Sequence, residues 1–315
     1  MDHNTADMGR RSIVARLPWA GNEAPEWLTA YTYALPALGL TVLLFAYPLA
    51  HSLWMSLHSV DMAGRLQDFV GLDNYVTVVT DDLFVPALWR TVRFAIAIIV
   101  GTVLLSITFA MSLNDPFPGR ALLRSIMILP WSVSQVMLAL TFGWIFNSTY
   151  GPLNGLLLEW GLVTDYRSWF ADGATVLNIL SFAVAWNLVP FATLLFTGAL
   201  QTVPDDLHRA ARIDGAGAVA RFFYVTLPAI KDTVLVVIVL ANLNAFLTFA
   251  PIMILTGGGP GSETTLLSWW GYEVGFREFR LGEAAAIFYL MTVVLAAIAV
   301  ATVIVLGRRP QDAQT

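Results

Sequence analysis

Six long apolar runs, separated by polar segments, form the pattern of this chain. They cover approximately residues 32–57, 92–113, 126–147, 174–203, 233–256 and 284–307. A helix rises about 1.5 Å per residue, so a run of roughly twenty apolar residues can cross a hydrocarbon core about 30 Å thick. The pattern therefore predicts an all-α polytopic membrane protein with six transmembrane helices.

The composition agrees with this class and argues against others. Of the 315 residues, 57% are hydrophobic and 12% are charged, and the mean hydropathy is +0.69. These values are typical of integral membrane proteins. The chain has no cysteine and only four scattered histidines, so neither disulfides nor a thiolate or histidine metal site is expected. The formal net charge of −5 does not suggest a nucleic-acid partner.

The two ends of the chain differ from its apolar body. Residues 1–31 mix polar, charged and proline residues, and too many of them precede the first apolar run for a cleavable signal peptide. Residues 308–315 are polar. We therefore expect an N-terminal tail at 1–31, a transmembrane domain at 32–307 and a C-terminal tail at 308–315.

Lysine and arginine are distributed unevenly between the two sides of the predicted membrane domain. Cytoplasmic segments of membrane proteins carry the excess of these residues. One side holds Arg10, Arg11, Arg16, Arg120, Arg124, Arg209, Arg212, Arg221, Lys231, Arg308 and Arg309. The other side holds Arg65, Arg90, Arg167, Arg277 and Arg280, with Arg93 at its edge. Both termini are therefore expected in the cytoplasm.

The polar segment at 204–232, between the fourth and fifth runs, has the pattern of a short helix, a turn and a second helix. Asp205 and Asp206 suit a helix N-cap and first turn, and Gly215 and Gly217 suit a break. A proline near the end is expected to redirect the chain into the next run. These features alone also fit an interfacial helix or a DNA-binding helix–turn–helix. The membrane flanks and the nearly cancelling charges argue against the latter.

This segment resembles the "EAA" loop of binding-protein-dependent ABC importer permeases. The resemblance rests on Ala210, Ala211, Asp214, Gly215, Ala216, Phe222, Leu227 and Pro228. In that family the loop forms a coupling helix, which inserts into a cleft of the ATP-binding subunit. The resemblance implies that these residues couple the ATPase to the membrane. Arg209 occupies the family's leading Glu position, so a Glu–Arg contact to the partner is not available in that form.

A glycine-rich stretch at 254–287 is the second signal. Its residues alone indicate a turn followed by an interfacial helix. The stretch is similar to the outer loop and final span of permeases in the di- and oligosaccharide branch of ABC importers, including maltose/trehalose-type permeases. The match covers Thr256–Pro260, the Phe276 region and Leu281–Gly282. The sequence FVGLDNY at 69–75 is likewise similar to a segment that sugar-importer permeases carry after their first span.

The spans carry almost no formal charge apart from Arg93 near an end, but they contain amide, hydroxyl and aromatic side chains. For any one of these, helix packing is the commoner role. As a set they suit a neutral polyhydroxyl solute, because amides both donate to and accept from sugar hydroxyls. A phosphate or carboxylate solute would be expected to meet Arg or Lys. The candidate pathway residues are Trp131, Ser134, Gln135, Trp186, Asn187, Phe191, Asn242, Asn244 and Phe249.

The resemblance implies a permease subunit of a type I ABC importer in the bacterial cytoplasmic membrane. Its expected partners are a second homologous permease, two ABC ATPases, an extracytoplasmic solute-binding protein, a sugar and membrane lipid. The chain lacks the Walker pattern, so ATP and magnesium are expected on the ATPases and no cofactor on this chain. Alternatives are import of glycerol phosphate or another small solute, and a scaffold or receptor subunit that transports nothing. A membrane-embedded enzyme would need ionisable residues clustered in the spans, and none occur there.

The predicted topology can be tested by cysteine labelling, because the natural chain contains no cysteine. A cysteine at Gly217 should react with an impermeant thiol reagent only from the cytoplasmic side, and one at Ser262 only from outside. Reaction of both positions from the same side would contradict six spans with this orientation.

Overall fold

The computed structural model describes residues 26–307, with side chains from residue 31 onward. The parts of the expected tails at 1–25 and 308–315 lie outside the described residues. The chain divides into two units, Met1–Trp54 and Met55–Thr315.

The first unit contains the first predicted span. Helix α1 (Glu26–Thr41) continues through a π-helical turn, η2 (Val42–Ala46), into α2 (Tyr47–Ser56). Together they give an apolar stretch from Tyr31 to Ser56 that is long enough to cross a membrane. The run expected at 32–57 is therefore confirmed as a helix.

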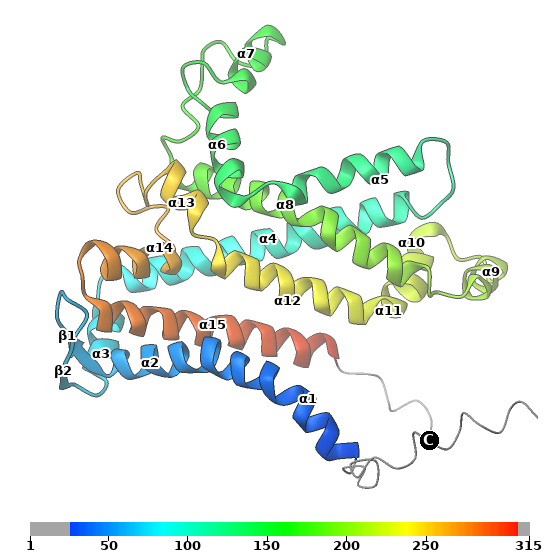
Figure 1. Cartoon of the computed structure of the whole chain (residues 1–315). Coiled ribbons are helices and arrows are strands. Elements are labelled where there is room, and N and C mark those ends of the chain that lie inside the picture. The colour runs from blue at the N-terminus through cyan, green and yellow to red at the C-terminus, as the bar shows by residue number, and fades with distance from the viewer. Residues whose placement is uncertain (1–25, 308–315) are drawn as a thin grey trace, which may run out of the picture. The chain divides into compact units, whose positions relative to one another are not determined.

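The second unit is mostly helical, with one small hairpin (Figure 1). Strands β1 (His58–Val60) and β2 (Leu66–Phe69) pair antiparallel. The helices up to the candidate loop are α3 (Asp73–Thr80), α4 (Phe84–Ser112), α5 (Arg120–Ile128), η3 (Leu129–Ser132), α6 (Gln135–Ile145), α7 (Pro152–Glu159) and α8 (Gly173–Leu200). The later ones are α9 (Asp205–Ile213), α10 (Ala218–Arg221), η4 (Phe222–Thr226), α11 (Leu227–Ala229), α12 (Lys231–Leu247), α13 (Ala250–Leu255), α14 (Leu267–Tyr272), η5 (Glu273–Arg277) and α15 (Leu281–Gly307).

Four helical stretches in the described residues are long and apolar enough to span a membrane, and two bent helix pairs bring the number to six. The straight spans are Tyr31–Ser56, α4, α8 and α15. The expected class, an all-α polytopic membrane protein, is confirmed. The expected start of the second span at residue 92 was too late, because α4 begins at Phe84 and extends beyond the apolar run.

The third and fifth spans are not the continuous helices that the apolar pattern predicted. In the third, α5 and η3 meet α6 at 99°, because Val133 is extended and Ser134 caps a new helix. In the fifth, α12 ends at Leu247 and α13 starts three residues later. Pro251 explains this break, since it lacks an N–H group and its ring would clash with the carbonyl of Leu247 in a continuous helix.

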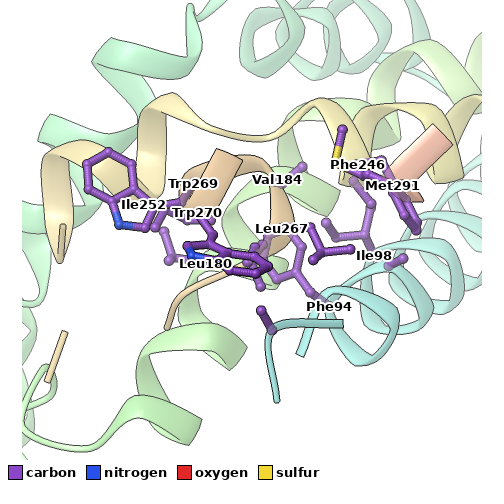
Figure 2. Close-up of a cluster of buried hydrophobic side chains, with 14 of the residues drawn as sticks. Phe94, Ile98, Leu180, Val184, Phe246, Ile252, Leu267, Trp269, Trp270 and Met291 are labelled. Carbon is purple, nitrogen blue, oxygen red and sulfur yellow. The ribbon is translucent and has the colours of Figure 1, made fainter. Parts of the chain in front are cut away.

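A hydrophobic core joins the spans to the glycine-rich stretch. Figure 2 shows its side chains converging from helices that lie far apart in the sequence. They include Phe94 and Ile98 of α4, Leu180 and Val184 of α8, Phe246 of α12, Leu267, Trp269 and Trp270 of α14, and Met291 of α15. Helix α14 is therefore buried in the core, whereas the sequence suggested an interfacial helix in an outer loop.

Candidate functional site

The predicted helix–turn–helix at 204–232 forms, and its turn has a defined geometry. Helix α9 starts after Pro204, with both Asp205 and Asp206 in its first turn, so neither acid is the N-cap. Gly215 has φ +83°. Its N–H donates to the carbonyl of Arg212, and the N–H of Ala216 donates to that of Ala211 (2.9 Å). This pair of bonds is the Schellman motif, which favours glycine because the backbone is left-handed there.

The second half of the segment redirects the chain later than expected. Gly217, with ordinary backbone angles, precedes α10, and η4 and α11 continue it through Pro228. The 75° bend lies between α11 and α12, at Ile230. Leu227–Pro228 was therefore wrongly expected to end this piece. Pro228 lies within the continuous helix Ala218–Ala229, directly after the π-helical turn η4, whose last bond runs from the N–H of Leu227 to the carbonyl of Phe222.

The base of the segment is anchored and its body is exposed. Val203 and Ile230 are buried in a small second core with Phe196 of α8 and Val237 of α12. The candidate residues Arg209, Ala210, Asp214, Gly215 and Pro228 are exposed, and Ala211, Ala216, Phe222 and Leu227 are partly buried. The exposed middle of the segment is therefore attached to α8 and α12 through buried residues near its two ends.

Large apolar side chains are exposed on the projecting segment. Ile213 is 86% exposed, and the others are Leu207, Val219, Phe223 and Tyr224. We call these five residues the loop patch. Several large apolar side chains exposed on one short segment are a feature of interaction sites. Arg209 contributes a charge beside it, paired with Asp206 at 2.5 Å on the exposed face of α9, and such exposed pairs stabilise little.

The break in the third span is held by a side chain from another span. Asn187 of α8 donates through Nδ2 to the carbonyl oxygens of Pro130 (2.5 Å) and Val133 (3.0 Å). Ser134 Oγ accepts from the N–H of Met137 and so caps α6. The sequence suggested a solute-binding amide at position 187. In the structure its amide N–H groups bond to two carbonyls at the break: that of Val133, and that of Pro130, which also accepts from the N–H of Val133 (3.2 Å).

Three candidate aromatic residues lie at or near this break. Trp131 stacks on Phe191 of α8 with ring centroids 5.3 Å apart, and Trp131 remains half exposed. Trp186 packs against Phe142 at 6.0 Å and lines an apolar hollow of about 430 Å³ with Pro130. Gln135 is the first residue of α6. The structure thus brings six candidates together: Trp131, Ser134, Gln135, Trp186, Asn187 and Phe191.

The remaining candidates lie around the break in the fifth span. Asn244 Nδ2 donates to the carbonyl of Leu240 in its own helix (2.9 Å). Asn242 Nδ2 donates to the carbonyl of Leu295 in α15 (3.1 Å), while its Oδ1 is buried without a partner among the described residues. Phe249 packs against Tyr272 at 4.6 Å. Asn242 therefore ties two spans together.

The two breaks are neighbours, because α6 packs against α13. The second break is also satisfied from a distance, since Ser268 Oγ of α14 donates to the carbonyl of Thr248 (2.8 Å). Irregular backbone at membrane depth is tolerated where it is buried in protein or lines a water-filled cavity. The pathway candidates of the third, fourth and fifth runs therefore lie in one region around the two adjacent breaks, which we call the candidate passage.

The glycine-rich stretch makes a hydrogen bond to α8 and a close packing contact, and the sequence revealed neither. Glu263 Oε2 accepts from the N–H of Gly173 at the start of α8 (2.9 Å). Gly258 has φ +91°, and a Cβ there would lie 2.8 Å from Trp269 Nε1. In the sequence, the consecutive glycines 257–259 followed by Pro260 indicate such a tightly packed turn. Within the described residues, no cluster of acidic or histidine side chains could hold a metal ion.

A family model supports the resemblance noted in the sequence. The model described as "Binding-protein-dependent transport system inner membrane component" matches residues 96–310. A probable ABC transporter permease protein of Brucella suis biovar 1 (strain 1330) is 35% identical over 265 residues, which cover 84% of this chain and 92% of the relative.

Two further relatives carry the names of solutes. The sn-glycerol-3-phosphate transport system permease protein UgpA of Escherichia coli O6:K15:H31 is 34% identical, over 83% of this chain and 88% of the relative. The trehalose/maltose transport system permease protein MalF of Thermococcus litoralis is 33% identical, over 80% of this chain and 84% of the relative.

A solved structure shares the fold. It is that of a bacterial ABC transporter involved in the import of the acidic polysaccharide alginate, with a TM-score of 0.75 and 22% sequence identity. The match covers 90% of this chain and 96% of the other.

Asn187 and Asn244 should differ in their effect on stability. Asn187→Ala removes two hydrogen bonds and leaves the carbonyl of Val133 without its side-chain partner, so it should lower the free energy of unfolding by about 1–3 kcal/mol. Asn244→Ala is the matched control, because its amide bonds only within its own helix. Thermal unfolding of the two purified variants measures the difference, and equal midpoints would contradict this role of Asn187.

Proposed function

The chain belongs to the family of binding-protein-dependent transport system inner membrane components, and we propose that it is the permease subunit of an ATP-driven importer for a neutral di- or oligosaccharide. Family membership makes it an ABC importer permease and an integral inner-membrane protein. We further propose its solute class, its partners, the cytoplasmic position of both termini and the roles of individual residues.

The segment at 204–232 is proposed to couple the permease to an ATPase subunit. The observation that supports this role is the exposed loop patch on an anchored base. Large apolar side chains such as Ile213 and Tyr224 are suited to a hydrophobic cleft on a partner. Small residues on the same segment, Ala210, Ala211 and Ala216, allow a partner to approach the backbone closely. ATP and magnesium belong to that partner in this proposal, and this chain catalyses no reaction.

The fold offers a physical route from the segment to the two breaks. Helix α8 leads into the segment and carries Asn187, which holds the break in the third span. Helix α12 leaves the segment and ends at the break in the fifth span. A displacement of the segment relative to the membrane would therefore act on both breaks through rigid helices. Closing and opening of an ATPase pair is proposed to drive that displacement.

The proposed solute is neutral because the candidate passage carries no formal charge. The apolar runs at 126–147, 174–203 and 233–256 contain no Asp, Glu, Lys or Arg. Around the breaks the available groups are amides, hydroxyls and aromatic rings, among them the stacked pair Trp131–Phe191. Such groups suit sugar hydroxyls and the apolar faces of sugar rings. The trehalose/maltose relative favours this solute, and the glycerol-phosphate relative favours the alternative of an anionic solute.

The proposed assembly contains a second homologous permease, two ABC ATPases and an extracytoplasmic solute-binding protein in a bacterial membrane. The family description refers to binding-protein-dependent transport, which supports the solute-binding protein as a partner. A related importer has been solved in complex with an alginate pentasaccharide-bound periplasmic protein, although this likeness concerns the fold alone.

Substitutions in the segment should uncouple the ATPase without removing the permease from the membrane. Gly215→Asp places a side chain where φ is +83°, at a cost on the order of 1 kcal/mol, and projects it from the docking surface. Ala211→Trp adds bulk beside that surface. We expect both variants to retain the partner permease and to lose bound ATPase or the stimulation of ATP hydrolysis by solute, measured by co-purification and in proteoliposomes.

Gly119→Asp is the matched control. Gly119 has φ +87° and open space around a Cβ, as Gly215 does, but it lies in the turn before α5. Normal ATPase recovery and stimulation in both loop variants would show that this segment is not the coupling element. It would also favour the scaffold alternative.

Solute competition tests the proposed sugar class. With the full complex and its binding protein in proteoliposomes, sugar phosphates and glycerol phosphate should compete poorly against the uptake of a neutral di- or oligosaccharide, because no cation lines the candidate passage. Asn244→Ala should reduce uptake while the complex still assembles. Strong competition by glycerol phosphate would overturn the neutral class and support the alternative solute.

A further inference from the structure

A cavity of about 730 Å³ lies between α4 and α8 in the second unit. Its wall is mainly apolar and includes Ile96, Ala97 and Val100 of α4 and Leu177 of α8. Toward the C-terminal ends of α4 and α8, beyond the cavity, the two helices approach closely, since a Cβ on Gly101 would lie 3.4 Å from that of Ala185. The cavity therefore begins where α4 and α8 diverge and widens toward the N-terminal ends of both helices.

Two arginines line this cavity without a counter-ion. Arg90 and Arg93 are three residues apart on α4, so they lie on one face of the helix. Neither takes part in an ion pair among the described residues, and Nη1 of Arg90 is buried without a hydrogen-bond partner there. A buried guanidinium N–H without a partner is costly. The site is therefore incomplete as the chain alone forms it.

The carboxylates that line the same cavity are already engaged. Asp172 accepts from the backbone N–H of Thr175 (2.8 Å) and from its hydroxyl, and these bonds lower the pKa of Asp172. Glu263 accepts from the N–H of Gly173. Both acids thus cap the N-terminus of α8, where the helix dipole favours negative charge. Both carboxylates keep their negative charge, so the lining contains two cations and two anions, and the group left without a hydrogen-bond partner among the described residues is Nη1 of Arg90.

The depth of the two arginines matches that of lipid headgroups. After Arg93, α4 continues through 94–112 without a charged residue. These residues span about 28 Å, close to the roughly 30 Å thickness of a hydrocarbon core. Arg90 and Arg93 therefore lie at the membrane surface, and the apolar wall lies at acyl-chain depth. Ile96 is 53% exposed and Val100 is 48% exposed along that wall.

The cavity lies away from the proposed passage. Asn178 of α8 lines the cavity, and Asn187 of α8 holds the break in the third span. Nine residues separate them, which is two and a half turns of a helix with 3.6 residues per turn. The two side chains therefore leave opposite faces of α8. An occupant of the cavity does not need to be the transported solute.

We propose that this cavity binds a phospholipid, with its phosphodiester between Arg90 and Arg93 and an acyl chain along Ile96, Ala97 and Val100. Arginine forks bind phosphate oxygens bidentately, and such bonds are charge-assisted. An occupant with one anionic group and a long apolar tail complements both parts of the cavity.

Native mass spectrometry of the assembled importer tests this proposal. Delipidated complex is titrated with phosphatidylglycerol, or with a glucosyl diacylglycerol that has the same tails and no phosphate. We expect the wild type to retain the phospholipid and to bind the glucolipid more weakly by about tenfold or more. Equal binding of the two lipids would overturn the proposal, because the phosphate would then not be recognised.

Variants in both parts of the cavity have matched controls. Arg90→Gln and Arg93→Gln should each lower phospholipid occupancy about tenfold, whereas Arg65→Gln, on the hairpin, should not. Ala97→Phe should fill the acyl groove, whereas Leu104→Phe, an exposed position of α4 outside the cavity, should leave binding unchanged.

Three other results would overturn the proposal. Unchanged phospholipid occupancy in all cavity variants would show that the lipid does not bind in this cavity. Displacement of the lipid by free glycerol phosphate would indicate a soluble anion as the occupant. Loss of the partner permease in Arg90→Gln, Arg93→Gln or Ala97→Phe would identify the cavity as a contact between subunits.

Discussion

The structure depends on satisfying backbone polar groups where a membrane offers no water. A straight span does so by itself, but a broken one leaves carbonyls that must find partners in the protein. Asn187 supplies two N–H groups to the third span, and Ser268 supplies its hydroxyl to Thr248 in the fifth. Both donors come from distant parts of the chain. Packing of α8 and α14 beside the breaks therefore stabilises both of them.

The same packing joins the exposed segment to the membrane interior. Its base is buried with Phe196 and Val237, side chains of the two helices that flank it. Those helices, α8 and α12, reach the two breaks (Figure 1). A loose segment would absorb a push from a partner, whereas an anchored one passes it to both helices. The fold thus supplies a mechanical connection that fits a permease driven from outside its own chain.

Charge is arranged by depth in this protein. Apart from Arg93 near one end of its run, the apolar runs contain no Asp, Glu, Lys or Arg, and the exposed segment carries several, which separates a membrane layer from a water layer. Arg90 and Arg93 lie at the boundary, beside the capped N-terminus of α8. Arginine at this level can use an apolar groove and a headgroup together. We therefore propose that the part of the chain at headgroup depth recognises a lipid.

The sequence by itself determined the membrane class, the number of apolar runs and the turn at Gly215. Apolar run length and the preference of glycine for a left-handed backbone are local properties. The tertiary structure alone decided that 126–147 is broken, that α14 is buried, and that Asn187 donates to backbone carbonyls. It also supplies Ser268 to the break in 233–256, which Pro251 favours locally. Each of these depends on a partner far along the chain: Asn187 for Pro130, Ser268 for Thr248, and the core around Trp269. Hydropathy cannot reveal such partners, because it records how apolar each residue is and not which residues meet.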